Sequence, residues 1–346
     1  MTEKDVRWGI VGAGKIAHRF ARSLALEPRS ELVAISCRSS ARAAAFAAQH
    51  GVPEEGTLSD EALGGVAGSA HAALLARPDV DAVYLALPHS MHLEWAVAAL
   101  RVGKAVLCEK PLCADAAQTR SLVDAARGGT TLLMEAMKTR FTPLYQRVRE
   151  LVAEGAIGGL LRVEALLEND MGDRIARGGD YLSDPDGGGI LLDSGIYCAS
   201  WVEDYLPGPL EVVRARARWD HGVDCFVDAE IASAGGDGAP TARLVTAADE
   251  GGPRTVRLVG TTGEIVVDDM HRPQRARLER AGAAPVGLDL PYPVDDFHDE
   301  IEHFVDLLLA GRAESDVMPL AASLRCAELL DAVRREMLAG RRSPQR

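Results

Sequence analysis

A lysine that follows an apolar run has the setting of an acid–base residue. Lys110 stands in Cys108-Glu109-Lys110-Pro111, directly after the predicted strand 105–108. Its ammonium could hydrogen-bond a substrate hydroxyl and stabilise the alkoxide that develops as hydride leaves carbon. The alternative is a surface lysine paired with Glu109. The strand-end position favours a catalytic lysine.

A second set of polar residues follows three glycines at 187–189. Asp193 and Tyr197 are four residues apart, so a helix beginning at Asp193 would place the carboxylate and the phenol on one face. A nearby ammonium would favour the phenolate of Tyr197, which could then act as the acid–base group, while Asp193 orients the substrate or the lysine. The alternative is a helix-capping aspartate with a tyrosine in the core.

A glycine turn near the start of the chain predicts a dinucleotide site. Gly12 and Gly14 follow the apolar run 8–11 and lead into a predicted helix that begins with Lys15 and Ile16. Gly12 allows a tight turn, Gly14 lets a phosphate approach the backbone, and the first N–H groups of the helix face the anion. A glycine-rich loop without a ligand is the alternative.

The end of the second predicted strand indicates which dinucleotide is bound. Cys37-Arg38-Ser39 occupies the place where an acidic residue would hold the ribose hydroxyls of NAD. A guanidinium and hydroxyls suit a 2′-phosphate, so NADP is favoured, with NAD possible. A solvated loop arginine is the alternative for Arg38.

Histidines follow a third strand end, in Leu87-Pro88-His89-Ser90-Met91-His92. We expect Leu87, Pro88, His89 and His92 to line the nicotinamide pocket, together with Glu109 and Lys110. No metal site is expected, because no carboxylate or cysteine pattern accompanies the histidines. Arg174, Arg177 and Asp180, in a polar loop, are candidates for substrate contacts or for a solvated loop.

The elements that must position these residues fall into two regions. Strands and helices alternate in the first part, and runs such as 82–86 are apolar throughout, which is typical of a parallel sheet covered on both faces. We expect an α/β fold: a doubly wound Rossmann domain over residues 1–137 and an α+β domain with a largely antiparallel open sheet over 138–346. Two amphipathic helices close the chain.

Composition restricts the class of partner. The chain has 346 residues, a formal net charge of −13 and 47% hydrophobic residues. The acidic balance argues against nucleic acid or an anionic membrane as partner, and no apolar run is long enough to span a bilayer. The six cysteines are scattered and read as reduced thiols. We therefore expect a cytoplasmic protein.

These motifs together resemble the glucose–fructose oxidoreductase / inositol dehydrogenase / MocA family. The resemblance runs through residues 9–17, 86–92, 103–112, 134–141 and 187–197, and its Glu-Lys-Pro element at 109–111 is specific. It implies that Lys110, Asp193 and Tyr197 form the catalytic set. A tyrosine at position 197 resembles the pattern of the dihydrodiol dehydrogenase and sugar-oxidoreductase branch of the family. Members of that branch often use NADP. His89 and Lys138 depart from the family pattern at positions expected to border the pocket.

The resemblance implies an NADP-dependent oxidoreductase that interconverts a secondary alcohol and a ketone on a sugar, polyol or cyclic diol. It also implies a homodimer or homotetramer, because the second-domain sheet commonly forms an interface. A glycosidase that uses NAD for transient oxidation and a non-catalytic nucleotide sensor are the alternatives. Arg38 counts against the first, and the Lys110, Asp193 and Tyr197 set against the second.

Overall fold

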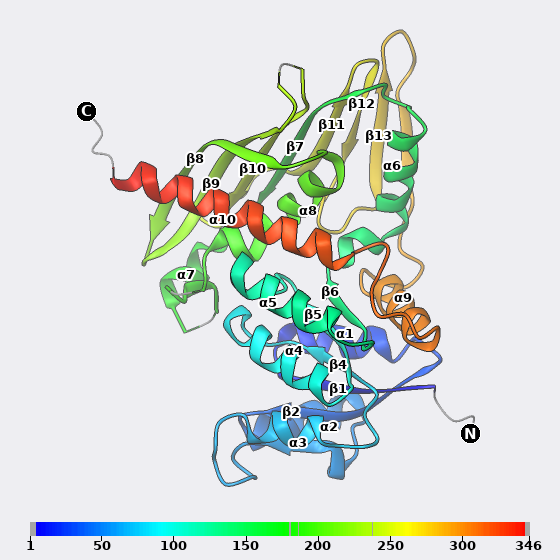
Figure 1. Ribbon diagram of the computed structural model, residues 1–346, viewed down its shortest axis with the longest axis vertical. Helices are drawn as coiled ribbons and strands as arrows, with labels where there is room; N and C mark the ends of the chain where they lie inside the picture. The colour runs from blue at the N-terminus through cyan, green and yellow to red at the C-terminus, as the bar shows by residue number, and fades with distance from the viewer. Residues whose placement is uncertain (1–4, 180, 186, 237, 343–346) are drawn as a thin grey trace. The chain divides into compact units, whose positions relative to one another are not determined.

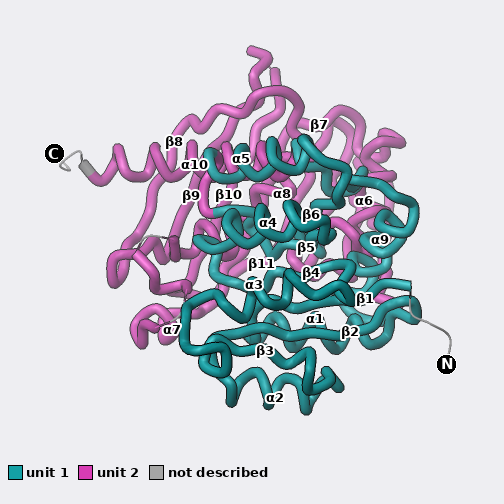
Figure 2. The backbone as a smooth tube through the Cα atoms, turned by 60° about the horizontal axis from the view of Figure 1, so that its bottom comes forward, with its two compact units in different colours: residues 1–113, 117–138, 294–321 teal, residues 114–116, 139–293, 322–346 magenta. Residues whose placement is uncertain are grey.

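The computed structural model describes residues 5–179, 181–185, 187–236 and 238–342. The chain divides into two compact units (Figure 2): unit 1 contains residues 1–113, 117–138 and 294–321, and unit 2 contains 114–116, 139–293 and 322–346. The change of unit after Lys138 lies next to the boundary predicted at residue 137. Residues 294–321, which that prediction placed in the second domain, group with unit 1. The assignment of cofactor and substrate binding to separate domains stays a prediction.

The first part of the chain alternates strands and helices (Figure 1). In chain order the elements are β1 (Val6–Val11), α1 (Lys15–Leu24), β2 (Ser30–Cys37), α2 (Ser40–His50), η1 (Glu54–Gly56), β3 (Thr57–Ser59), α3 (Ser69–Leu75), β4 (Ala82–Leu85), η2 (His89–Met91), α4 (His92–Arg101), β5 (Ala105–Glu109), α5 (Ala116–Arg127), β6 (Leu133–Ala136) and η3 (Lys138–Phe141). The described part of unit 1 holds a six-stranded sheet in the order β3-β2-β1-β4-β5-β6, with every pairing parallel.

This sheet is buried on both faces, as its apolar strands predict. Side chains of α3, α4 and α5, among them Leu74, Trp95 and Leu122, pack in one core cluster with Val83 and Val106 of the strands. The Trp8 ring contacts the Phe20 ring of α1, with centroids 5.5 Å apart, and the Phe304 ring of α9 (His298–Leu309), at 5.0 Å. Helix α9 therefore packs with unit 1 although it comes late in the sequence.

Unit 2 is built on a second sheet. Its elements are α6 (Pro143–Ala153), β7 (Leu160–Glu168), α7 (Gly172–Arg177), η4 (Tyr181–Ser183), η5 (Leu191–Gly195), α8 (Ile196–Tyr205), β8 (Leu210–Asp220), β9 (Val223–Ser233), β10 (Thr241–Ala247), β11 (Arg254–Gly260), β12 (Gly263–Val267), β13 (Arg275–Arg280), β14 (Val286–Asp289) and α10 (Leu320–Arg342). In the described residues the strand order is β14-β13-β12-β11-β7-β10-β9-β8, and only β7 and β10 pair in parallel.

The two faces of this second sheet differ. Along β7 the side chains of Val163 and Ala165 are buried, while Arg162 and Glu164 between them are half-buried and charged. The segments η5 and α8 pack on strands of this sheet, namely β7, β9 and β10. The predicted α/β class, with a doubly wound sheet and a largely antiparallel sheet, is confirmed.

Two further expectations concern the whole chain. The six cysteines are all buried, and within the described residues none of them forms a disulfide. Among the described residues, every helix is too short or too polar to cross a lipid bilayer.

Candidate active site

The glycine turn lies between β1 and α1 of unit 1. Gly12 has φ +100°, and a Cβ there would lie 2.4 Å from the Ala86 carbonyl oxygen, so only glycine fits. Gly14 is the N-cap residue of α1, and a Cβ on Gly14 would meet no atom within 4 Å. Lys15 and Ile16 form the first turn, where backbone N–H groups have no helical partner. This open, donor-rich helix start suits a pyrophosphate.

The predicted 2′-phosphate segment ends β2 and begins α2. Cys37 is buried, burial raises the pKa of its thiol, and its Sγ donates to the Ser39 carbonyl oxygen at 3.3 Å. The thiol therefore packs inside the turn, and contact of Cys37 with a cofactor stays a prediction. Arg38 is exposed and Ser39 is the N-cap residue of α2, and the contact of these two residues with a 2′-phosphate stays a prediction.

Sequence reasoning missed Arg42 and Glu61 beside this segment. Arg42, in the first turns of α2, donates from Nη2 to the Ala13 carbonyl oxygen at 2.6 Å, which ties it to the glycine turn. A second arginine shortly after Arg38 was the signal in the sequence that could have found it. The Glu61 carboxylate accepts the Ser40 N–H at 2.8 Å, so an acidic group also stands at the start of α2.

The histidines after β4 differ in their surroundings. His92 is fully buried, and its Nδ1 and Nε2 lie 3.0 and 2.9 Å from the carbonyl oxygens of Pro111 and Leu87. Burial lowers its pKa, so the neutral ring donates to one of these oxygens at a time. His92 thus ties together the two loops that carry His89 and Lys110. Direct contact of Leu87, Pro88, His89 and His92 with a cofactor stays a prediction.

Lys110 follows β5, which lies between β4 and β6. The Glu109 carboxylate accepts a hydrogen bond from the Lys110 backbone N–H at 3.1 Å. It accepts a second hydrogen bond from the Tyr84 hydroxyl. Burial raises the pKa of Glu109, and the Lys110 charge opposes this rise. The lysine is half-buried. Because parallel strands end at one edge of a sheet, Lys110 lies at the same edge as the turn of Gly12 and Gly14.

The second candidate set lies in unit 2. Asp193 belongs to the π-helical turn η5 and Tyr197 to the first turn of α8, so the helix predicted from Asp193 begins with a wider turn. Both side chains are 9% exposed, and the Tyr197 ring lies 5.8 Å from the ring of His271, centroid to centroid. A Cβ on Gly195 would approach Leu191 and Thr246, so this glycine provides room for internal packing. Such π-turns often occur at functional sites.

Asp193 is held by a residue that the sequence did not single out. The Tyr181 hydroxyl donates to its Oδ1 at 2.8 Å, and the Ser194 hydroxyl lies 3.3 Å from Oδ2. The guanidinium of Arg174 lies over the Tyr181 ring, 5.7 Å from its centroid. The predicted contact residue Arg174 therefore reaches Asp193 indirectly. Arg177 donates to the Asp173 carbonyl oxygen, and Asp180 lies outside the described residues.

Asp224 supports the same turn from β9. Its Oδ2 accepts the Leu191 N–H at 2.7 Å, and a Cβ on Gly189 would lie 2.2 Å from its Oδ1. Gly189 has φ +93°, a backbone conformation that residues other than glycine rarely adopt. Gly189 is therefore needed for the turn itself.

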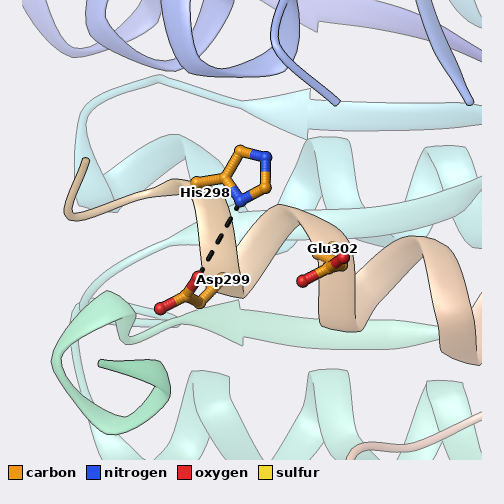
Figure 3. A group of neighbouring side chains, drawn as sticks. All are labelled: His298, Asp299 and Glu302. Atoms are coloured by element: carbon orange, nitrogen blue, oxygen red, sulfur yellow. Dashed lines mark ion pairs between the residues drawn. The ribbon is translucent and has the colours of Figure 1, made fainter. Parts of the chain in front are cut away.

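One group of potential metal ligands was not predicted. His298, Asp299 and Glu302 lie at the start of α9, with a ligand atom of each within 4.8 Å of the others (Figure 3). The His298 Nδ1 lies 3.8 Å from an Asp299 oxygen. Burial raises the pKa of Asp299, His298 opposes this, and Glu302 adds to it. Within this group, His298 and Asp299 form a contact between side chains at the start of a helix. In the described residues the group shares no member with the candidate catalytic set.

Comparison with known proteins defines the class to which this fold and these residues belong. The model of the "Oxidoreductase family, NAD-binding Rossmann fold" matches residues 6–136, and the "GFO/IDH/MocA C-terminal domain" matches residues 145–266. The chain belongs to the glucose–fructose oxidoreductase / inositol dehydrogenase / MocA family of oxidoreductases.

Individual relatives are similar over almost their full length. Trans-1,2-dihydrobenzene-1,2-diol dehydrogenase of Bos taurus is 31% identical over 95% of this chain and 96% of its own. The enzyme of the same name from Mus musculus is 32% identical over 95% and 96%. A 3-ketoreductase of Actinomadura kijaniata, solved with NADP and TDP-benzene, is 31% identical over 96% of this chain and 98% of its own, with a TM-score of 0.82.

A more distant structure shares the fold alone. Aldose-aldose oxidoreductase of Caulobacter crescentus is 23% identical over 97% of this chain and 98% of its own, with a TM-score of 0.84.

Proposed function

We propose that the protein is an NADP-preferring dehydrogenase or reductase that interconverts a secondary alcohol and a ketone on a sugar, polyol or cyclic diol. The observation that carries this proposal is Lys110, held at the edge of the unit 1 sheet where the glycine turn also lies, with a buried carboxylate beside it. The diol dehydrogenases and the 3-ketoreductase among the relatives support the substrate class.

The residues of unit 1 fit a dinucleotide with a 2′-phosphate. The start of α1 offers the backbone N–H groups of a first helical turn and space at Gly14, and the start of α2 offers the guanidinium groups of Arg38 and Arg42. Arginine binds phosphate through paired, charge-assisted hydrogen bonds. The ketoreductase relative was solved with NADP, and we expect NAD to be the weaker cofactor.

The chain's own groups handle the proton. When bound, the nicotinamide would supply or accept the hydride. The Lys110 ammonium donates a hydrogen bond to the substrate oxygen and stabilises its negative charge during the reaction. The Tyr197 phenolate takes the hydroxyl proton during oxidation, and the phenol returns it during reduction. Asp193, fixed by Tyr181, orients the substrate. The 3-ketoreductase was also solved as a lysine variant and as a tyrosine variant, which supports the choice of Lys110 and Tyr197 for mutation.

A cofactor-reduction screen tests the proposal. Aldoses, inositols and cyclic diols are offered to the wild-type protein with NADP and with NAD in parallel, and the Lys110→Ala variant is the control. We expect reduction of NADP by at least one of these substrate classes and none in the variant. NADP binding without any redox activity would indicate a sensor, and turnover of a glycoside without net cofactor reduction would indicate a glycosidase.

We also propose a homo-oligomer that forms through the charged face of the unit 2 sheet. Opposite charges alternate on this face: Arg162 pairs with Glu164 and Glu230, and Arg243 and Arg216 both pair with Asp228. Such a self-complementary pattern suits a twofold interface. Sedimentation velocity should give a dimer or tetramer of the chain, and a monomer at micromolar concentration would contradict this part of the proposal.

A further inference from the structure

A short turn between β12 and β13 of unit 2 places a histidine beside Tyr197. The ring of His271 lies 5.8 Å from the ring of Tyr197, centroid to centroid, and the two ring planes are tilted by 58°. The His271 side chain is 15% exposed, so it is largely enclosed but still reaches solvent. Histidine is the side chain that most often carries a proton in enzyme reactions. His271 therefore adds a titratable group next to the proposed acid–base residue.

The turn that carries His271 is strained and is held by its neighbours. Asp269 has φ +49°, a left-handed conformation that residues other than glycine seldom adopt. Nε1 of Trp201, in α8, donates to the Met270 carbonyl oxygen at 3.0 Å. The Thr139 hydroxyl donates to the His271 carbonyl oxygen at 2.9 Å. Strained backbone that the surrounding structure holds in this way is typical of functional sites.

Asp269 also places a carboxylate next to the imidazole. Its Oδ1 lies 3.4 Å from Nδ1 of His271, which is an ion-pair distance when the imidazole is protonated. A carboxylate in this position favours the imidazolium. Tyr197, His271 and Asp269 thus form a row in which a hydroxyl group is followed by an imidazole and then by a carboxylate. Hydroxyl groups that are activated by a base, with a third group orienting the base, follow the same order.

Other charged and titratable groups lie around this row. Nε of Arg254, in β11, lies 3.4 Å from Oδ1 of Asp269, so Arg254 and His271 share one carboxylate. Arg272 follows in the same turn, and its backbone N–H donates to the Asp269 carbonyl oxygen at 2.6 Å. From α8 the Cys198 thiol packs against the turn, and burial raises its pKa, so the thiol stays neutral. Of these groups, the imidazole is the one whose ordinary titration range includes neutral pH.

We propose that His271 takes the phenol proton of Tyr197 during alcohol oxidation and passes it to solvent, while Asp269 stabilises the imidazolium. The proton leaves the Tyr197 oxygen for a ring nitrogen of His271, directly or through one water. The phenolate then takes the hydroxyl proton of the substrate as the hydride passes to the nicotinamide, and reduction reverses this order. Asp193 adds a carboxylate four residues before Tyr197, and its negative charge opposes a phenolate, so a nearby proton acceptor assists the reaction.

His271 is a positioning residue in this scheme, because it acts on the substrate through Tyr197. The inference rests on the proposed function.

The contact between His271 and Asp269 can be measured without activity. NMR of the protein with labelled histidine follows the titration of each imidazole, and His271→Gln identifies the His271 signal by its loss. The midpoint of this titration should fall by about one pH unit or more in Asp269→Asn, because the carboxylate that favours the imidazolium is gone. Asparagine tolerates the left-handed backbone, so the turn should be kept. An unchanged midpoint, or a His271 imidazole that does not titrate, would overturn the proposal.

The matched control for this measurement is a second pair of the same kind in unit 2. Asp220 and His221 lie in the hairpin between β8 and β9, and their side chains pair at 2.8 Å. Asp220→Asn should leave the midpoint of the His271 titration in place. A shift of similar size in this variant would show that the effect does not come from the Asp269 contact.

The proton transfer is measured by the kinetics of alcohol oxidation. His271→Ala should lower kcat about 10- to 100-fold with KM within a few-fold of wild type, and imidazole added to the solution should restore part of the loss. In His271→Gln the acidic limb of the kcat/KM profile should move to higher pH by about one unit or more, because Tyr197 must then lose its proton unaided. His221→Gln should change neither kcat nor the limb.

Each outcome of the kinetics has one meaning. A wild-type kcat in His271→Ala, or a loss that imidazole does not restore, would overturn the role of His271 and leave the proposed function intact. If His271→Ala does not fold, His271→Gln decides, and an unchanged acidic limb overturns the role. A wild-type protein that turns over no substrate would refute the proposed function instead.

Discussion

The Tyr181 hydroxyl donates a 2.8 Å hydrogen bond to Oδ1 of Asp193, so the orientation of the candidate catalytic aspartate depends on a neighbouring phenol. A hydrogen bond to a charged group contributes about 1.5–3 kcal/mol. We predict that Tyr181→Phe lowers kcat/KM roughly 10-fold or more, because Asp193 then takes several orientations. Steady-state kinetics with the best substrate of the screen measures this loss. Tyr205→Phe is the matched control, because the buried Tyr205 hydroxyl has no hydrogen-bond partner in the described part of the chain, and it should leave kcat/KM unchanged.

Arg38 and Arg42 should determine the choice of cofactor. Loss of one charge-assisted contact to the 2′-phosphate costs about 1.5–3 kcal/mol, so Arg38→Ala should weaken NADP binding about 10- to 100-fold and leave NAD binding nearly unchanged. Fluorescence titration with NADPH and NADH measures both affinities. Equal weakening for the two cofactors would contradict a phosphate contact.

Glu61 provides a second test at the start of α2, in which NADP binding should become tighter instead of weaker. Its carboxylate accepts the Ser40 N–H at the start of α2, where the phosphate charge is expected. Glu61→Gln removes a negative charge and should tighten NADP binding several-fold, with little effect on NAD. Weaker NADP binding in this variant would place the phosphate elsewhere.

The sequence predicted those parts of the fold that depend on local pattern. The parallel sheet, the Gly12 turn and the helices 298–309 and 320–342 follow from apolar periodicity and glycine placement. The packing of α9 on Trp8 with unit 1 was not predicted, because periodicity shows that a face is buried but not what covers it.

The candidate site shows the same limit. Lys110, Asp193 and Tyr197 were identified from residue type and spacing. Tyr181 was missed because its partner lies twelve residues away across an irregular loop. Asp224 was missed because a β9 residue meets the glycine turn only in the folded chain. Three-dimensional contacts of this kind leave no regular spacing in the sequence.

A buried ion pair should stabilise unit 2. Nη2 of Arg140 lies 2.5 Å from Glu203, which also pairs with Arg325, and the Arg140 side chain is 2% exposed. Removing one partner of a buried pair costs about 3–5 kcal/mol because the other charge stays buried. Arg140→Met should therefore lower the midpoint of thermal unfolding strongly. Arg147→Met, which removes an exposed pair with Glu150, should leave the midpoint unchanged, and equal effects would contradict this assignment.

Glu300, a buried glutamate near the start of α9, should make the stability depend on pH. Its pKa in the folded protein is raised mainly by burial, whereas an unfolded glutamate has a pKa of about 4.3. Above that value the unfolded state has lost the proton that the folded state keeps, so this group makes the protein less stable as pH rises toward the folded pKa. Urea unfolding of Glu300→Gln should show a gain over wild type of up to about 1.4 kcal/mol for each pH unit in that interval. A difference that is independent of pH would contradict a raised pKa of Glu300 in the folded protein.

The central claim is that Lys110 acts in the chemical step and contributes little to the affinity for the cofactor. The measurement that tests it most directly compares NADPH affinity, by fluorescence titration, with turnover in Lys110→Ala. Loss of one acid–base group lowers turnover by about 10²–10⁴-fold, and we predict that loss with an NADPH affinity within a few-fold of wild type. Turnover near the wild-type rate in this variant would contradict the account.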